Sequence, residues 1–232
     1  MRDRLRYAHR RRFCHTASPT QGMRFHPIPT VDFIALLARR WLVALALLTG
    51  GLWLPPVLAA ASAEEAALLA ALQGPGHVLL MRHADAPGYG DPAGYVLGKC
   101  ATQRNLGDAG KKQAKTIGAW LSQQGIASAH LFSSPWCRCL DTAQLLNKGA
   151  VKTEASLGSF FDNMALEKKQ TKALEGFIQN ELAKAAKAPL ILVTHHVNIQ
   201  AYTGRVVGVG DMVLVKVNPK GQHLSHTVYP SP

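Results

Sequence analysis

Short apolar runs alternate with helix-like patterns over residues 64–232, and this alternation predicts an α/β fold. Turn-forming residues bound the runs, as they usually bound the strands of a sheet. Residues 218–221, Asn-Pro-Lys-Gly, separate the last two runs, so we expect an antiparallel hairpin at one edge. Helices separate the other runs, which predicts a three-layer α/β/α sandwich with a mostly parallel sheet. The strand candidates are His77–Met81, His130–Ser133, Pro189–Thr194, Met212–Asn218 and His223–Tyr229.

Two segments, residues 107–125 and 165–186, carry the three- and four-residue spacing of amphipathic helices. Their apolar stripes consist of Gly110, Ala114, Ile117 and Leu121 in the first segment and Leu174, Phe177, Ile178 and Leu182 in the second. We interpret both stripes as faces that pack against the sheet. The lysines that lie mostly outside these stripes are then a solvated surface.

Residues 1–63 differ from the rest of the chain in charge. They hold nine of the 26 Lys and Arg residues and two of the 14 Asp and Glu residues. Arg39-Arg40, an apolar run broken by Gly and Pro, and Ala61-Ser62-Ala63 follow one another in the order of a secretory signal. We therefore expect a leader at 1–63, with Met23 as an alternative start, and one domain at 64–232 that is exported to the periplasm. The alternative is an uncleaved leader that anchors the chain in the inner membrane.

The position of the basic residues also bears on possible partners. Residues 64–232 carry a net charge of +5, out of the formal +12 of the whole chain. A nucleic-acid-binding domain concentrates its basic residues on its own surface, and this domain does not. We therefore expect no nucleic-acid partner, and contact with a membrane only through the leader.

The expected domain contains three cysteines, Cys100, Cys137 and Cys139. A Cys-x-Cys pair with one distant cysteine lacks the four ligands of a structural zinc site, so we expect no metal. In an oxidising compartment we expect one disulfide, which joins Cys100 to Cys137 or to Cys139.

Basic side chains follow three of the predicted strands. The first strand is followed by Arg82-His83, the second by a segment that contains Arg138, and the third by His195-His196. Ligands of open α/β sheets bind beyond the carboxyl ends of the strands, where these groups would meet. Like charges in one cleft repel each other, so such a cluster requires an anion.

A phosphoryl group fits this requirement, because guanidinium groups match its oxygens in geometry and charge. The segment SSPWCRCLDTA predicts a helix with Pro135 in its first turn, and the amino end of that helix would add a favourable partial charge. The sequence contains no P-loop and no glycine-rich nucleotide loop, so ATP is not the expected donor.

Four segments then resemble one family in the family's own order. RHADAPG resembles the Arg-His-Gly signature of the histidine phosphatase superfamily (phosphoglycerate mutase-like), with Ala84 in place of the usual Gly. RNLGDAGKKQA, SSPWCRCLDTA and VTHHVNI resemble its later motifs. The resemblance spans about residues 77 to 204. It implies a phosphoglycerate mutase-like fold and catalysis without a cofactor.

The resemblance implies a role for each matching position. His83 would be the nucleophile that forms a phosphohistidine, and Arg82, Arg138 and His195 would hold the phosphoryl oxygens. Arg104 would bind substrate at the rim. Imidazole attacks only when it is neutral, and we expect the two nearby arginines to lower the pKa of His83.

The proton donor does not follow from the resemblance. Asp162 and His196 are equal candidates, and Asp85 and Asp91 rank behind them. We expect a phosphatase that acts on phosphomonoesters or on phosphohistidine, whose substrate is a small molecule, a sugar phosphate or a phosphopeptide. A relative that binds phosphate but does not catalyse is the alternative.

Overall fold

The computed structural model describes residues 67–184 and 188–232. The chain divides into two units, and residues 54–232 form the second of them. The predicted leader therefore lies outside the described residues, and its cleavage stays a prediction. No helix among the described residues is both long enough and apolar enough to cross a membrane.

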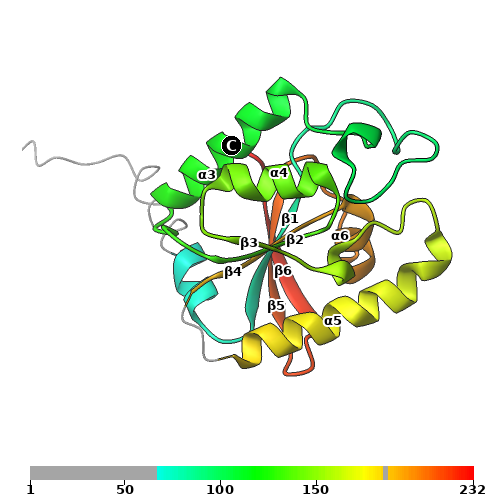
Figure 1. Ribbon diagram of the computed structural model, residues 1–232. Helices are drawn as coiled ribbons and strands as arrows, with labels where there is room; N and C mark the ends of the chain where they lie inside the picture. Colours follow the sequence, from blue (N-terminus) through cyan, green and yellow to red (C-terminus); the bar gives the residue numbers. More distant parts are fainter. Residues whose placement is uncertain (1–66, 185–187) are drawn as a thin grey trace, which may run out of the picture. The chain divides into compact units, whose positions relative to one another are not determined.

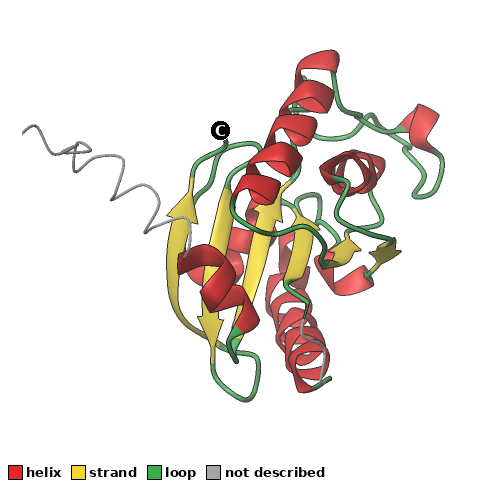
Figure 2. Cartoon of the chain, turned by 90° about the vertical axis from the view of Figure 1, so that its left-hand side faces the viewer, coloured by secondary structure: helices red, strands yellow, loops and turns green. Residues whose placement is uncertain are grey.

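A six-stranded sheet forms the centre of the second unit, with the strand order β3-β2-β4-β1-β5-β6 (Figures 1 and 2). Pairs β1–β4, β2–β4 and β2–β3 are parallel, while β5 and β6 form an antiparallel hairpin at one edge. The mostly parallel sheet and the edge hairpin are confirmed. The strands are β1 His77–Arg82, β2 His130–Ser133, β3 Val151–Thr153, β4 Leu190–Thr194, β5 Met212–Val217 and β6 His223–Tyr229.

The helices are α3 Asp108–Gln123, α4 Cys137–Leu146, α5 Glu167–Ala183 and α6 His196–Thr203, with 3-10 turns η1 Cys100–Thr102, η2 Ala155–Leu157 and η3 Met164–Leu166. Residues 67–73 are also helical. Pro135 lies before α4, not in its first turn as predicted, because the helix begins only after the extended residue Trp136. Arg138 does lie in that first turn.

Alternate residues of the central strands point to opposite faces of the sheet, and both faces are covered. Leu79 and Met81 of β1 pack in a cluster with residues of α3 and α4. Val78 and Leu80 pack in a second cluster with residues of α5 and α6. Figure 1 shows α3 and α4 on one side of the sheet and α5 on the other. The three-layer sandwich is therefore confirmed.

One disulfide joins Cys100 of η1 to Cys137 at the start of α4. The two cysteines are 37 residues apart in the sequence, and closing a loop of that length stabilises a fold by about 4 kcal/mol in the chain-entropy account. The bond confirms one of the two predicted pairings. Cys139 is a buried free thiol.

Candidate active site

The parallel pairing of β1 with β4 brings the two histidine motifs together. Arg82 is in register with Thr194, and His83 N donates to Thr194 O at 3.0 Å. His83 and His195 therefore leave adjacent strands at the same level. Their ring centroids are 5.5 Å apart.

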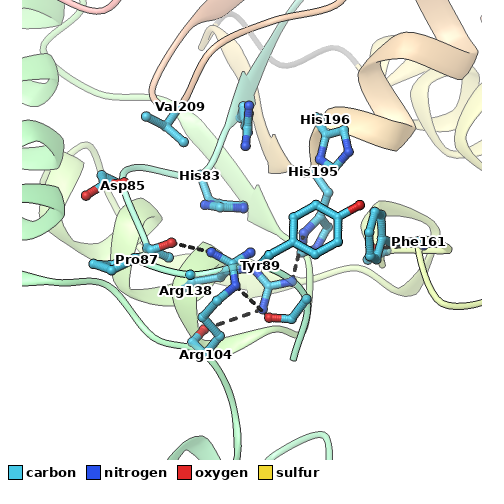
Figure 3. A pocket seen from close by; sticks show the side chains of 15 residues that line it. His83, Asp85, Pro87, Tyr89, Arg104, Arg138, Phe161, His195, His196 and Val209 are labelled. Atoms are coloured by element: carbon cyan, nitrogen blue, oxygen red, sulfur yellow. Dashed lines mark hydrogen bonds between the residues drawn. The ribbon is translucent and has the colours of Figure 1, made fainter. Parts of the chain in front are cut away.

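A pocket of about 350 Å³ opens beyond these strand ends, and Figure 3 shows its labelled side chains. Every predicted catalytic residue lines it, and so do Arg104 and His196, whereas Asp162 and Asp91 do not. The lining residues are Arg82, His83, Asp85, Ala86, Pro87, Gly88, Tyr89, Gly90, Arg104, Arg138, Ser159, Phe161, His195, His196 and Val209.

The hydrogen bonds of His83 determine which of its ring nitrogens is available. His83 Nδ1 lies 2.8 Å from the carbonyl oxygen of Ala84. A carbonyl oxygen only accepts hydrogen bonds, so the proton of a neutral ring lies on Nδ1. The lone pair on Nε2 is then free for attack.

The pKa of His83 is lowered to about 3, mainly by burial and to a smaller extent by the charges of Arg138, Arg82 and Arg104. The hydrogen bond to Ala84 acts in the opposite direction. The predicted direction of the shift is confirmed, but its main cause was wrong. Loss of hydration, more than the arginines, disfavours the imidazolium, because the ring is 2% exposed.

The other two histidines of the pocket also favour their neutral forms. Burial lowers the pKa of His195 well below its usual value, and the neighbouring His83 and Arg138 lower it too. His195 Nε2 lies 2.8 Å from Ser134 Oγ. Burial also lowers the pKa of His196, and the three arginines of the pocket add to this effect. His196 becomes an effective proton donor only when a bound anion raises its pKa.

Arg138 is held from behind by a buried carboxylate. Its Nη1 donates to both carboxylate oxygens of Asp91, at 2.9 and 3.0 Å. The two side chains are 4% and 3% exposed. Asp91 also accepts from the indole N–H of Trp136 and from the backbone N–H of Arg104. Asp91 therefore fixes the orientation of Arg138 and is not free to donate a proton.

The two other arginines differ in how many donors they have available. Of the Arg82 nitrogens, only Nη1 has a hydrogen-bond acceptor among the described residues, the carbonyl oxygen of Val207 at 2.8 Å. Arg104 instead donates through Nε to Gly90 O at 2.7 Å and through Nη1 to Ala86 O. Arg104 therefore holds the loop over the pocket with two of the donors that were expected to bind substrate.

The carboxylates predicted as proton donors differ in their position relative to the pocket. Asp162 is exposed and accepts a hydrogen bond from Tyr95 Oη at 3.3 Å. Asp85, which ranked lower in the sequence, is the one carboxylate among the residues that line the pocket. The sequence could not predict that Asp85 lines the pocket, because no local pattern shows which way the loop at residues 84–106 runs.

The family model of the histidine phosphatase superfamily (branch 1) matches residues 78–166. Residues 78–166 are therefore similar to this superfamily. The matched segment contains Arg82, His83, Arg104 and Arg138, whereas the late histidine motif at residues 193–199 lies beyond it. The parallel pairing of β1 with β4 places that motif beside the matched segment.

Three solved phosphatase structures align with the chain at low identity. The protein histidine phosphatase SixA, complexed with tungstate, is 15% identical over 66% of this chain and 94% of its own, with a TM-score of 0.45. A mycobacterial glucosyl-3-phosphoglycerate phosphatase with inorganic phosphate is 13% identical over 67% of this chain and 97% of its own, with a TM-score of 0.49. Phosphoserine phosphatase from Entamoeba histolytica, in complex with 3-phosphoglyceric acid, is 14% identical over 67% of this chain and 97% of its own, with a TM-score of 0.48. No curated protein sequence matches the chain.

Several residues of the segments that resemble the superfamily motifs make hydrogen bonds or close contacts with the backbone around the pocket. Thr142 accepts from Ala84 N and donates to Arg138 O, so it ties the His83 loop to α4. Gln113 accepts from Asp85 N at 2.9 Å. A Cβ at Gly110 would lie 1.9 Å from Asp85 O, so only glycine fits there. Ala84 replaces the usual Gly without strain, because its backbone is not among those with positive φ.

The buried neutral histidines predict a loss of stability in acid. The pKa of His83 is about 3 when folded, whereas that of an unfolded histidine is about 6.5. The unfolded chain therefore binds the extra proton between these values, and stability falls as the pH drops through this window. We expect the free energy of unfolding to fall by about 1.4 kcal/mol per pH unit for each such histidine. Urea unfolding of the full chain between pH 7 and 4 measures this slope.

A His83→Asn variant should show a smaller slope than the wild type. His130 is exposed on β2, so His130→Asn serves as the control and should keep the wild-type slope. Equal slopes for the wild type and His83→Asn would contradict the assignment of His83 as a neutral buried ring.

Proposed function

We propose that this chain is a phosphoric monoester hydrolase that works through a phosphohistidine on His83. One observation carries the proposal: His83, with Nε2 unprotonated, lines the same small pocket as Arg82, Arg138 and His195. A neutral imidazole beside two guanidinium groups combines a nucleophile with a binding site for a phosphoryl dianion. The superfamily match supports this chemistry but does not distinguish hydrolysis from transfer.

In the first step, the lone pair of His83 Nε2 forms a bond to phosphorus, and the bond between phosphorus and the ester oxygen breaks. Arg82 and Arg138 stabilise the charge on the equatorial oxygens during this in-line transfer. The buried ion pair with Asp91 keeps Arg138 in place before substrate arrives. Positioning and electrostatics therefore supply most of the catalysis.

The leaving oxygen then needs a proton unless its conjugate acid is strong. Asp85 and His196 line the pocket and are the candidates that the geometry favours over Asp162. General acid help is worth about 10²- to 10⁴-fold for a poor leaving group. In the second step, water attacks phosphorus, the bond to Nε2 breaks, inorganic phosphate leaves and His83 is neutral again.

We also propose that the domain works in an oxidising compartment such as the periplasm. The disulfide between Cys100 and Cys137 supports this location, because structural disulfides persist mainly in oxidising compartments.

Rapid-quench labelling of the full chain with ³²P-labelled phenyl phosphate tests the proposed mechanism. We expect turnover, inhibition by vanadate, and a protein-bound phosphoryl group that acid releases and alkali does not, as for a phosphorus–nitrogen bond. Binding of inorganic phosphate without turnover of any ester that has a good leaving group would overturn the proposal. That result would instead favour the phosphate-binding relative without catalysis.

A further inference from the structure

Two aromatic side chains meet at the pocket, from two different loops. Tyr89 belongs to the loop after β1, and Phe161 belongs to the segment between η2 and η3. Their ring centroids are 5.1 Å apart and their planes are 82° from parallel, an edge-to-face arrangement. Both line the pocket, and Phe161 lies 5.8 Å from the ring of His196. Figure 3 shows Tyr89 and Phe161 among the labelled side chains that line the pocket.

Tyr89 is 86% exposed, although an aromatic side chain of this size stabilises a fold or a complex most when it is buried. It is flanked by Gly88 and Gly90, whose φ angles of 95° and 65° lie in the left-handed region. The two glycines let the chain turn sharply on both sides of the tyrosine. The ring is therefore presented at the tip of a tight loop.

Arg104 stabilises this presentation. Its guanidinium donates to Ala86 O before the tip and to Gly90 O after it. Its backbone N–H donates to Asp91, which in turn holds Arg138. The loop that carries Tyr89 is thus connected through hydrogen bonds to the arginine expected to hold the phosphoryl group. The exposed ring consequently has a defined position relative to the proposed phosphoryl site.

We propose that Tyr89 and Phe161 form a subsite that binds the planar aromatic ring of a phosphate ester while its phosphoryl group lies at His83. This inference deepens the function proposed above and rests on it. An edge-to-face pair leaves one ring face open, and a third ring can stack on that face or meet it edge-on. A pocket of about 350 Å³ accepts a phosphoryl group with one ring more readily than a large substrate.

The leaving-group chemistry is consistent with this substrate class. A phenol oxygen, or the imidazole ring nitrogen of a phosphohistidine, needs less help from a general acid when it leaves than an alkoxide does. Among the described residues that line the pocket, Asp85 is the one carboxylate. A site with few acids is therefore better suited to aryl or imidazolyl phosphates than to alkyl phosphates.

Binding of two phosphonates of similar size tests the subsite without any turnover. Phenylphosphonate and cyclohexylphosphonate both have a carbon–phosphorus bond that the proposed chemistry does not break, and they differ in the flatness of the ring. We expect the full chain to bind phenylphosphonate about ten-fold more tightly, the factor that one aromatic contact provides. Tyr89→Leu and Phe161→Leu should each remove most of this preference. Both should leave the affinity for inorganic phosphate nearly unchanged.

Two further variants complete the design. Tyr89→Phe keeps the ring and should keep the preference, whereas Leu224→Ala removes an exposed apolar residue of β6 outside the pocket and should change nothing. Equal affinity of the wild type for the two phosphonates would overturn the subsite. Loss of phosphate and phenylphosphonate binding by the same factor in Tyr89→Leu would overturn it too, since the ring would then act only on the pocket as a whole.

A kinetic arm separates this inference from the proposed function. Benzyl and cyclohexylmethyl phosphate have leaving groups of similar basicity, so a higher kcat/KM for the benzyl ester reports ring binding alone. Turnover of both esters at equal kcat/KM would overturn the subsite and leave the phosphatase proposal standing. A preference for phenylphosphonate in a chain without turnover would support the subsite and remove the catalytic proposal. Comparison of phosphotyrosine with phosphohistidine then identifies the source of the ring.

Discussion

Replacement of His83 by Ala should reduce the turnover of phenyl phosphate by at least about 10³-fold, because the proposed reaction then lacks its nucleophile. Of the three pocket histidines, His83 is the one that lies within the segment matched by the superfamily model. Its Nδ1 bond to Ala84 leaves Nε2 as the attacking atom. The ³²P-labelled phosphoryl group should be absent from the quenched variant. Steady-state assay and quench labelling of the same preparations give both measurements.

His130→Ala is the matched control, because His130 is an exposed histidine of β2 that does not line the pocket. It should keep wild-type turnover. Binding of vanadate or phosphate by His83→Ala, through the remaining arginines, would show that the pocket is still formed. A phosphoryl group trapped on the His83→Ala protein would move the covalent step to another residue.

The strand ends made most of the site predictable from the sequence. Parallel neighbours place their carboxyl ends at one edge, so Arg82-His83 and His195-His196 converge once β1 and β4 pair. The pattern of apolar residues predicted these strands to within one residue at each end. Strand β3 was missed, because it has three residues and is only partly buried. A run of that length carries no measurable periodicity.

The contacts made by the loop after β1 could not be predicted in the same way. Its side chains reach partners far along the chain, such as Asp91 with Arg138 and Tyr95 with Asp162. No local spacing relates such residues, since the path of the loop depends on glycines, a disulfide and Arg104 together. For this reason we predicted Asp91 only as a lower-ranked proton donor from the sequence. In the structure it instead accepts two hydrogen bonds from Arg138 and fixes the orientation of that side chain.

Of the substitutions Asp85→Ala, Asp91→Ala and Asp162→Ala, Asp91→Ala should be the most destabilising. It leaves the buried guanidinium of Arg138 without its counterion and also removes an acceptor from Trp136. Breaking a buried ion pair from one side costs about 3 to 5 kcal/mol. We expect a loss of this size in the free energy of unfolding, measured with urea at pH 7. We also expect kcat/KM to fall, because Arg138 loses its fixed orientation.

A double-mutant cycle separates the ion pair from simple truncation. Asp91→Ala combined with Arg138→Ala should be more stable than Asp91→Ala alone, because the double variant no longer buries an unpaired charge. Asp108→Ala is the surface control, since the Asp108–Lys111 pair is exposed and should contribute little. If Asp91→Ala were as stable as the wild type, another group or water would have to compensate the buried charge of Arg138. The hydrogen bonds from the Tyr89 loop through Arg104 and Asp91 to Arg138 would then contribute little to the stability of the site.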